Sequence, residues 1–115
     1  MHRLIIDLES WMNRDHGEVD FYLTQFLTGH GYFRDMLFKW RRVASPECLH
    51  CPGEPDTAEH TFFRCPHFTE GRPPFDEWRP EGVVPEMLRS AANWYSVAGY
   101  VRVTLIRKKE EGFLL

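Results

Sequence analysis

The chain has 115 residues, of which 43% are hydrophobic, and this is enough for one domain with a modest core. A formal net charge of −3 and a pI of about 6.0 exclude the strong basic excess of a dedicated nucleic-acid binder. The start of the chain has no cleavable signal pattern, and no apolar run approaches the roughly 18 residues of a membrane span. We therefore expect a soluble intracellular protein with no membrane partner.

Residues 1–43 are predicted to form an N-terminal helical segment, because three stretches repeat apolar residues at helical spacing. The positions that share these three faces are Leu4, Ile5, Leu8, Trp11 and Met12; Val19, Tyr22, Leu23, Phe26 and Leu27; and Phe33, Met36, Leu37 and Trp40. Gly29 is placed for the position just past the end of the second helix. The third helix should end in cations, which suit its negative dipole end: Lys39, Arg41 and Arg42.

The second half of the chain divides at its prolines. Residues 44–70 form an irregular loop, and residues 71–85 form a proline-rich connection, in which Pro73 and Pro74 oppose a long helix but allow a short turn at 75–78. Residues 86–115 should form a C-terminal helical segment, with a helix from about Glu86 or Asn93 to Lys109 and a break near 91–93. Its buried face is expected to hold Trp94, Val97, Ala98, Val101 and Leu105.

The expected fold class is therefore mainly α: a small helical domain with an irregular loop between N-terminal helices and a C-terminal helix. A short strand is a minor alternative near the end of the chain, where β-branched residues stand at positions 101, 103 and 106.

The irregular loop holds all three cysteines and three histidines, and four of these residues form the pattern Cys-x2-Cys-x8-His-x4-Cys: Cys48, Cys51, His60 and Cys65. Zinc prefers four such ligands in a tetrahedron, and Cys3His is a common closed structural set. Asp56 with Glu59 three residues later resembles a capping box, so a helical turn should present His60. The pattern predicts a structural zinc site.

The cysteines and histidine of the loop have other interpretations. Ordinary buried thiols with an unrelated surface histidine would need no metal, while a redox Cys-x-x-Cys motif requires a βαβ context that is not visible. A catalytic zinc would leave one position for water, whereas four protein ligands are present. His50 and His67 flank the cysteines, so either of them can replace His60 as the fourth ligand.

Two runs carry a family resemblance: DLESWMNRDHGEVDFYLTQFLTGHGYFRDML and SPECLHCPGEPDTAEHTFFRCPHF. They closely resemble the C-terminal end of the reverse-transcriptase polyprotein of non-LTR (LINE-type) retrotransposons of the R1-like group. The resemblance implies a CCHC zinc knuckle whose ligands are Cys48, Cys51, His60 and Cys65. The basic helix usual after that knuckle is replaced here by GRPPFDEWRPEG. Nothing resembles paired catalytic aspartates, an endonuclease or a ribonuclease H, so we expect a non-catalytic fragment.

The resemblance further implies contact with template RNA or with single-stranded or target DNA during target-primed reverse transcription, beside the upstream reverse-transcriptase domain and in the nucleus. Arg41, Arg42 and Arg64 are candidates for phosphate contacts. Phe62 and Phe63 are candidates for stacking on unpaired bases. In the alternative interpretation, the two phenylalanines pack the knuckle against the helices and the arginines form a solvated helix end.

Two further functions are compatible with the residues. In the first, zinc clamps the helices and their apolar faces dock on the upstream polymerase or another copy of the chain, as the abundant aromatic residues and the negative net charge suggest. In the second, the chain is a hydrolase using His30 or His67. The sequence offers no nucleophile for such an enzyme.

Overall fold

The computed structural model describes residues 8–113, which form a mainly helical fold. The elements follow in the order α1 (Leu8–Met12), α2 (Phe21–Thr28), α3 (Arg34–Lys39), η1 (His60–Arg64), η2 (Pro66–Phe68), α4 (Phe75–Trp78), α5 (Pro80–Arg89) and α6 (Ala91–Phe113). Within these residues there is no strand, and the β pairing is one isolated bridge between Glu47 and Pro55. The predicted fold class, helices around an irregular Cys/His loop, is confirmed.

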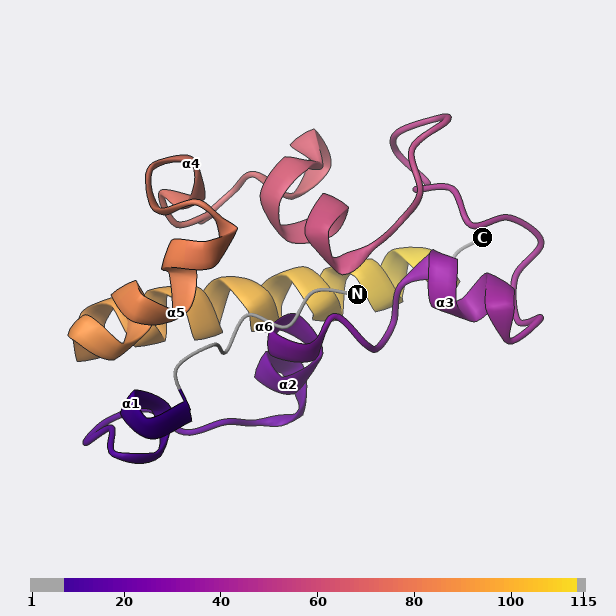
Figure 1. The fold of residues 1–115 in the computed structure, drawn as a ribbon. Coiled ribbons are helices and arrows are strands. Elements are labelled where there is room, and N and C mark those ends of the chain that lie inside the picture. The colour runs from indigo at the N-terminus through magenta and orange to yellow at the C-terminus, as the bar shows by residue number, and fades with distance from the viewer. Residues whose placement is uncertain (1–7, 114–115) are drawn as a thin grey trace.

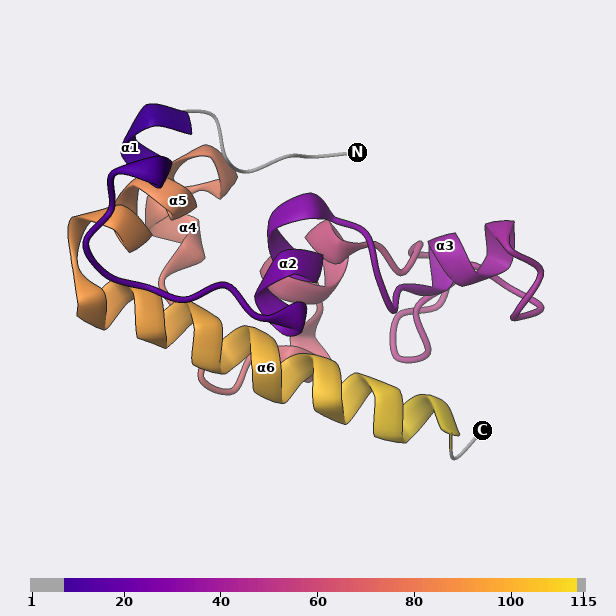
Figure 2. The ribbon, with the colours of Figure 1, turned by 90° about the horizontal axis from the view of Figure 1, so that it is seen from below.

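Helix α6 sets the long dimension of the molecule. Its 23 residues span about 34 Å at 1.5 Å per residue, within a longest extent of 42 Å. Helices α2 and α5 pack against it, and α4 packs against α5. Figure 2 shows α6 running along one side of the molecule, and both Figures 1 and 2 show α1 and α5 near its start and α3 and the irregular loop near its end. One helix therefore contacts both the body of the fold and the loop.

The apolar core lies between α6, α2, α5 and η1. Phe62 of η1 has no exposed surface and stands edge-on to Phe26 of α2, with ring centroids 5.0 Å apart. The predicted face of the last helix is confirmed, since Ala98 packs against the core and the others are buried: Trp94, Val97, Val101 and Leu105. At the start of α6, Trp94 lies so close to Gly17 that a Cβ there would come within 2.2 Å of the indole ring. A glycine is therefore required where the N-terminal segment crosses α6.

Side-chain caps explain where α2 and α6 begin. The Asp20 carboxylate accepts a hydrogen bond from the N–H of Leu23 (2.8 Å), and Ser90 Oγ accepts one from the N–H of Asn93 (3.0 Å). Helix α2 ends as predicted at Gly29, which has a φ of 72° and donates its N–H to the carbonyl of Gln25.

The C-terminal helices differ from the prediction. A separate helix, α5, occupies residues 80–89, and the first part of this range was expected to belong to the proline-rich connection. Helix α6 starts after Ser90, which has an extended backbone, and continues to Phe113. Pro80 stands in the first turn of α5, where its missing N–H costs nothing. Pro85 lies inside α5 and removes one helical hydrogen bond, but burial of Val83, Val84 and Met87 compensates. The short helix α4 confirms the expected turn at 75–78.

Three predicted core positions are exposed instead. Met12, Val19 and Trp40 keep 72%, 41% and 57% of their surface accessible, because α1 has five residues, α2 begins after Val19, and α3 ends before Trp40. The prediction was therefore wrong for these side chains. Leu4 and Ile5 lie outside the described residues. The alternative strand near residues 101–106 is excluded, since these residues are helical. No helix within residues 8–113 has the length and apolar character needed to cross a membrane.

Candidate metal centre

A tight turn positions the first two cysteines. Glu47 bridges to Pro55, the N–H of Cys48 donates to the carbonyl of Glu54 (2.8 Å), and the N–H of Glu54 donates to the carbonyl of Cys51 (3.1 Å). Gly53 has a φ of 84°, which suits glycine where the chain reverses. The two-residue gap between the cysteines therefore turns both thiols toward one point.

A π-helix positions the other two candidate ligands. The N–H of Cys65 donates to the carbonyl of His60, five residues earlier, at 2.7 Å. In an α-helix, residues five apart would point about 140° away from each other. The wider π turn avoids this divergence, and it explains why a spacing of four intervening residues can bring both side chains to one site.

The four side chains meet as the sequence predicted. Their ligand atoms all lie within 4.8 Å of one another, and the Sγ of Cys65 is 3.8 Å from that of Cys51 and 3.9 Å from that of Cys48. Two thiolates on a tetrahedral zinc, with bonds of about 2.3 Å, would stand about 3.8 Å apart. The cysteines are free, since a disulfide needs about 2.05 Å between its sulfurs. The spacing therefore fits a metal.

The histidine supplies an independent observation. Its Nε2 is buried and has no hydrogen-bond partner among the described residues. A buried polar atom without a partner costs free energy, and a metal bond would satisfy it. Burial also lowers the pKa of His60, which favours the neutral form that binds metals.

The protonation of the thiols follows from the same burial. Burial is the main cause that raises the pKa of Cys48, Cys51 and Cys65, while the backbone N–H of His50 and that of His67 oppose it at Cys48 and Cys65. In the metal-free chain the thiols are thus neutral at pH 7, and metal binding must displace their protons. Four protein ligands leave no open position, so the ion would support the fold rather than activate water.

Asp56 holds the loop to the helices, which sequence reasoning missed. It is completely buried, and its carboxylate accepts hydrogen bonds from the N–H of Arg34 (2.9 Å) and the hydroxyl of Thr61 (2.9 Å) and pairs with Lys108 of α6. The predicted capping box was therefore wrong: Thr57 caps the turn instead, accepting the N–H of His60 at 3.0 Å. A buried aspartate cannot be told from a capping one by spacing alone.

Arg72 and Tyr100 close the other side of the loop. The Arg72 guanidinium donates to the carbonyl of Cys65 (2.8 Å) and to the hydroxyl of Tyr100 (3.0 Å), and that hydroxyl donates to the carbonyl of Phe68 (2.6 Å). Since Tyr100 is on α6, the last candidate ligand is tied to the long helix. Neither residue carries a signal in the sequence.

Of the three histidines in the loop, the structure places one beside the cysteines. His60 joins the three cysteines, whereas His50 and His67 lie against Glu111 of α6, at 2.9 and 2.8 Å. Burial raises the pKa of Glu111, but hydrogen bonds from His67 and His50 outweigh that effect and lower it. The two histidines therefore belong to a separate cluster.

The residues predicted to contact nucleic acid differ in how far they are exposed. Arg41 and Arg42 are exposed in the turn after α3, and Arg64 is exposed and pairs with Glu59 at 3.1 Å. Phe63 is half-buried against Phe26 and Phe75. Phe62 is fully buried, and its ring fills the core. The prediction that it stacks on bases is therefore wrong.

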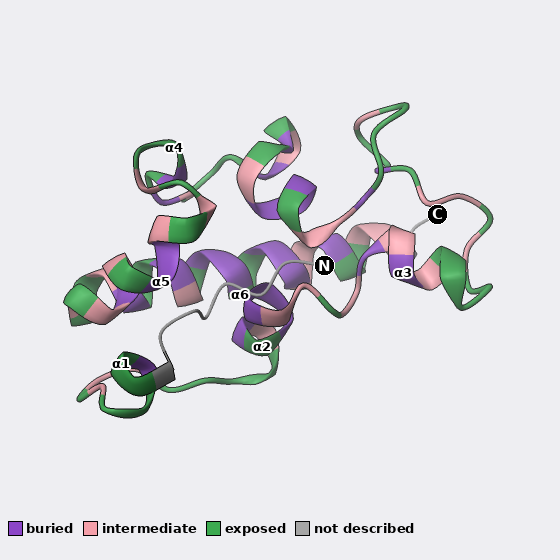
Figure 3. Cartoon of the chain, viewed as in Figure 1, coloured by how far each residue is buried: buried purple, intermediate pink, exposed green. Residues whose placement is uncertain are grey.

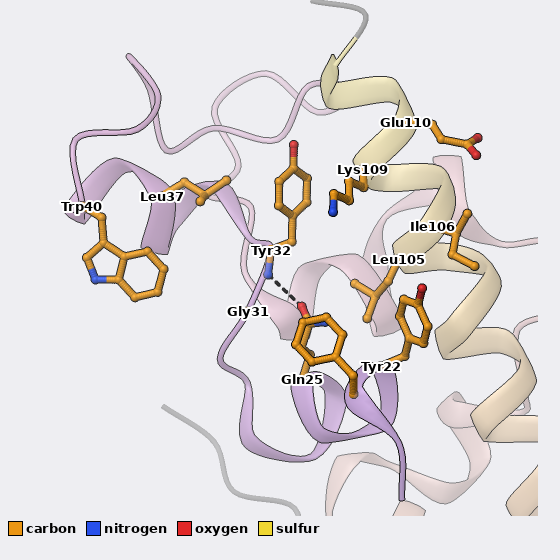
Figure 4. Close-up of a pocket in the computed structure, with 11 residues that line it drawn as sticks. Tyr22, Gln25, Gly31, Tyr32, Leu37, Trp40, Leu105, Ile106, Lys109 and Glu110 are labelled. Carbon is orange, nitrogen blue, oxygen red and sulfur yellow. Dashed lines mark hydrogen bonds between the residues drawn. The ribbon is translucent and has the colours of Figure 1, made fainter.

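An exposed aromatic surface does lie near these arginines. Trp40 precedes Arg41 and lines an apolar cavity of about 470 Å³ between α2, α3 and α6 (Figure 4). Tyr22, Tyr32 and Leu37 also line it, and the backbone N–H of Tyr32 donates to Gln25 Oε1 at 2.8 Å. Sequence reasoning assigned Trp40 to the core, because it continues the spacing of the α3 face.

Fold and site together define a class: a small, mainly helical domain whose Cys3His cluster is compatible with a zinc knuckle. Over 62 residues the chain is 37% identical to a protein of Nasonia vitripennis described as "Retrovirus-related Pol polyprotein from type-1 retrotransposable element R1 4". That similarity supports a retrotransposon origin, and it covers 54% of this chain and 14% of the polyprotein. No family model matches the chain, and no solved structure matches it.

Proposed function

We propose that this chain is the zinc-binding, nucleic-acid-binding module of an R1-like retrotransposon reverse transcriptase. It would assist RNA or DNA binding during target-primed reverse transcription in the nucleus, beside the upstream polymerase region, and would perform no catalysis itself. The observation that carries the proposal is the buried, unpartnered Nε2 of His60, whose ring lies beside three thiols. The sulfur of Cys65 stands at tetrahedral spacing from the other two. The partial similarity to the R1 polyprotein supports the retrotransposon setting.

In this proposal the ion is held by Cys48, Cys51, His60 and Cys65, and its contribution is to fold the knuckle. The protein around it does the positioning. Asp56 and Arg72 attach the loop to α3 and α6, so the turn after α3 is held at a defined place relative to the knuckle.

The proposed nucleic-acid surface consists of Arg41 and Arg42 with the neighbouring Trp40. All three are exposed on the turn after α3. The two guanidinium groups would pair with phosphates, and the indole would stack on an unpaired base, which is worth about 1–3 kcal/mol. Phe63 and Arg64 can contribute from the π-helix, where Phe63 is half-buried and Arg64 is exposed. A local surface of this kind is compatible with a net charge of −3.

The metal is tested by elemental analysis of the purified chain and of Cys65→Ser and His60→Ala. We expect one tightly bound zinc per wild-type chain and a loss or marked weakening in both variants. A folded wild type that holds no zinc under metal-replete conditions would overturn the structural role of the site.

The surface is tested by titrating single-stranded RNA and DNA at several salt concentrations with wild type and Arg41→Ala/Arg42→Ala. If two phosphate contacts are lost, affinity falls and the slope of log K against log salt becomes shallower by about 1.4, or about 0.7 per contact. Arg89→Ala is the matched control, since Arg89 is exposed at the end of α5, at the far end of the molecule from α3 (Figure 1). Binding that is absent, or equal in wild type and the double variant, contradicts the proposal.

A second candidate function is protein docking on the upstream polymerase region. It is favoured by the apolar cavity between α2, α3 and α6, and by Phe21 at its edge, which keeps 74% of its surface exposed. Phe21→Ser should then weaken binding to a purified polymerase region and leave zinc content unchanged. A monomeric chain that fails to bind that region counts against docking.

A further inference from the structure

A second group of possible metal ligands lies beside the cysteine cluster. His50 comes from the turn between the first two cysteines, His67 from η2, and Glu111 from α6. The Nε2 of His50 is 2.9 Å from one oxygen of the Glu111 carboxylate, and the Nε2 of His67 is 2.8 Å from the other. The imidazole rings are stacked, with centroids 3.5 Å apart and planes at 18°. Two nitrogens and a carboxylate therefore converge on one place.

This convergence follows from a repeated pattern in the knuckle. Each histidine stands two residues after a cysteine, in Cys48-Leu49-His50 and Cys65-Pro66-His67. The backbone N–H of each histidine counteracts the rise in the thiol pKa that burial causes at that cysteine. When the cysteines meet, the two imidazoles are therefore placed side by side. Glu111 reaches them because α6 extends to Phe113.

The cluster is not fully satisfied by hydrogen bonds. The Nε2 of His67 faces Glu111 Oε2 at 2.8 Å and Arg107 Nη2 at 3.2 Å. A carboxylate only accepts hydrogen bonds and a guanidinium only donates them. The single Nε2 cannot donate to one and accept from the other at the same time, so one of the two contacts is unmet. A cation bound to the Nε2 lone pair and the carboxylate, with Arg107 turned outward, removes this conflict.

We propose that His50, His67 and Glu111 form a second metal site, which takes a divalent ion of borderline softness such as Zn²⁺. Two imidazoles and a carboxylate are a ligand set that zinc uses. On a tetrahedral ion with bonds of about 2.0–2.2 Å, such atoms stand about 3.3–3.5 Å apart. The observed nitrogen-to-oxygen distances are about half an ångström shorter, and the stacked rings hold their nitrogen lone pairs nearly parallel. Binding therefore requires the three side chains to move apart and the two imidazole planes to tilt toward one ion.

This second site differs from the Cys3His site in its chemistry. Its ligands are nitrogen and oxygen without sulfur, and its side chains keep 26–30% of their surface exposed. Three protein ligands also leave one position for water. The second ion is therefore expected to bind more weakly and to exchange more readily than the first. When bound, it would attach both Cys-x-His segments of the knuckle to the end of α6.

The test is calorimetric titration of the one-zinc form of the full chain with Zn²⁺ alone, for wild type and for Glu111→Gln and His67→Ala. Wild type should bind one further ion, and each variant should lose that event or weaken it by more than about 100-fold, since even outer-shell partners contribute about 10- to 100-fold. Glu110→Gln is the matched control, because Glu110 is the neighbouring carboxylate on α6 but lies outside the cluster. Each variant is first checked for one retained zinc and native helicity.

Co²⁺ titration gives an independent readout, because thiolate-to-cobalt charge-transfer bands report the Cys3His site and the second site adds none. Arg107→Gln, as the only substitution in the chain, should tighten the binding of the second ion, because it removes a cation 3.5 Å from Glu111 Oε2. A wild type saturated at one ion per chain overturns the proposal. So does a second event of equal strength in Glu111→Gln, His67→Ala and Glu110→Gln, because the ion then binds elsewhere.

Discussion

The helical body and the knuckle are held together by different means. The body, formed by α2, α5, α6 and the η1 residues packed on them, buries a continuous apolar core, as Figure 3 shows along α6 and α2. The knuckle, residues 47–68 apart from the η1 side chains that pack on the body, buries Cys48, Cys65 and Phe68 as a small cluster of its own, with Cys51 half-buried beside them. Such a cluster cannot supply enough apolar burial for stability. The body can fold by exclusion of water, whereas the knuckle would be stabilised by the proposed ion.

The two regions are nevertheless coupled through η1. This π-helix carries His60, which faces the cysteines, and Phe62, which fills the body core. Asp56 adds a second connection, because its carboxylate bonds to α3 and to Lys108 of α6. Variants placed in one region or at the junction should therefore separate the two contributions.

The largest effect is expected from Cys65→Ser, or from removal of the metal. A structural zinc in small domains contributes about 10–16 kcal/mol of binding free energy at pH 7. We expect amide NMR signals of the knuckle to collapse toward unfolded positions while far-UV circular dichroism keeps most of the helical signal of the body. If the variant loses nearly all helicity, the body depends on the ion and the contrast between the regions fails.

The next largest effect distinguishes the contribution of core packing from that of metal binding. Trp94→Ala and Phe62→Ala each remove a fully buried aromatic side chain, which costs about 3–5 kcal/mol of unfolding free energy. Zinc affinity should fall in Phe62→Ala, since η1 also carries His60, and should be unchanged in Trp94→Ala at the far end of α6. Chemical denaturation measures the first quantity and competition with a zinc chelator the second. Equal zinc affinities in the two variants would show that η1 does not couple the core to the metal site.

A smaller effect is expected at the junction. Asp56→Asn leaves Lys108 buried without its charge partner, which costs about 3 kcal/mol. Adding Lys108→Met should return part of that loss, because the unpaired charge is then gone. Asp76→Asn, on the exposed surface of α4, is the control and should change stability by less than about 0.5 kcal/mol. Denaturation midpoints of the four proteins test this, and a double variant no more stable than Asp56→Asn argues against a charge effect.

The smallest effect concerns Tyr100 and pH. Burial is the main cause that raises the pKa of Tyr100 above its ordinary value of 10.0, against the opposing hydrogen bond from Arg72. The unfolded chain therefore loses this proton above pH 10 while the folded chain keeps it. The contribution of Tyr100 to stability is complete below pH 10 and is lost as pH rises through the folded-state pKa.

Tyr100→Phe should remove this part of the loss of stability at alkaline pH. It should also lower the free energy of unfolding by about 1–3 kcal/mol at pH 7, because the carbonyl of Phe68 loses its hydrogen-bond donor. Denaturation midpoints between pH 7 and 11 measure both effects. Tyr95→Phe is the control, since Tyr95 is 59% exposed. If the alkaline slope of Tyr100→Phe equals that of wild type, the buried hydroxyl does not contribute to it.

The sequence by itself determined the helical character, the C-terminal core face and the three cysteines that meet in the knuckle. Each of these follows from local information. Helical periodicity selects Trp94, Val97 and Val101, and the spacing of cysteines and histidine along the chain selects the ligand candidates. The choice of His60 over His50 and His67 was not determined in this way, because all three stand within reach of a cysteine in the sequence.

Only the tertiary structure decided which histidine lies with the cysteines. It also decided the roles of Asp56, Arg72 and Glu111. Their contacts with distant elements span 22 positions for Arg34 with Asp56, 28 for Arg72 with Tyr100 and 61 for His50 with Glu111. No local pattern encodes a partner so distant. The exposure of Trp40 has the same origin, since the end of α3 at Lys39 depends on what packs around it. Burial and long-range pairing are properties of the assembled chain.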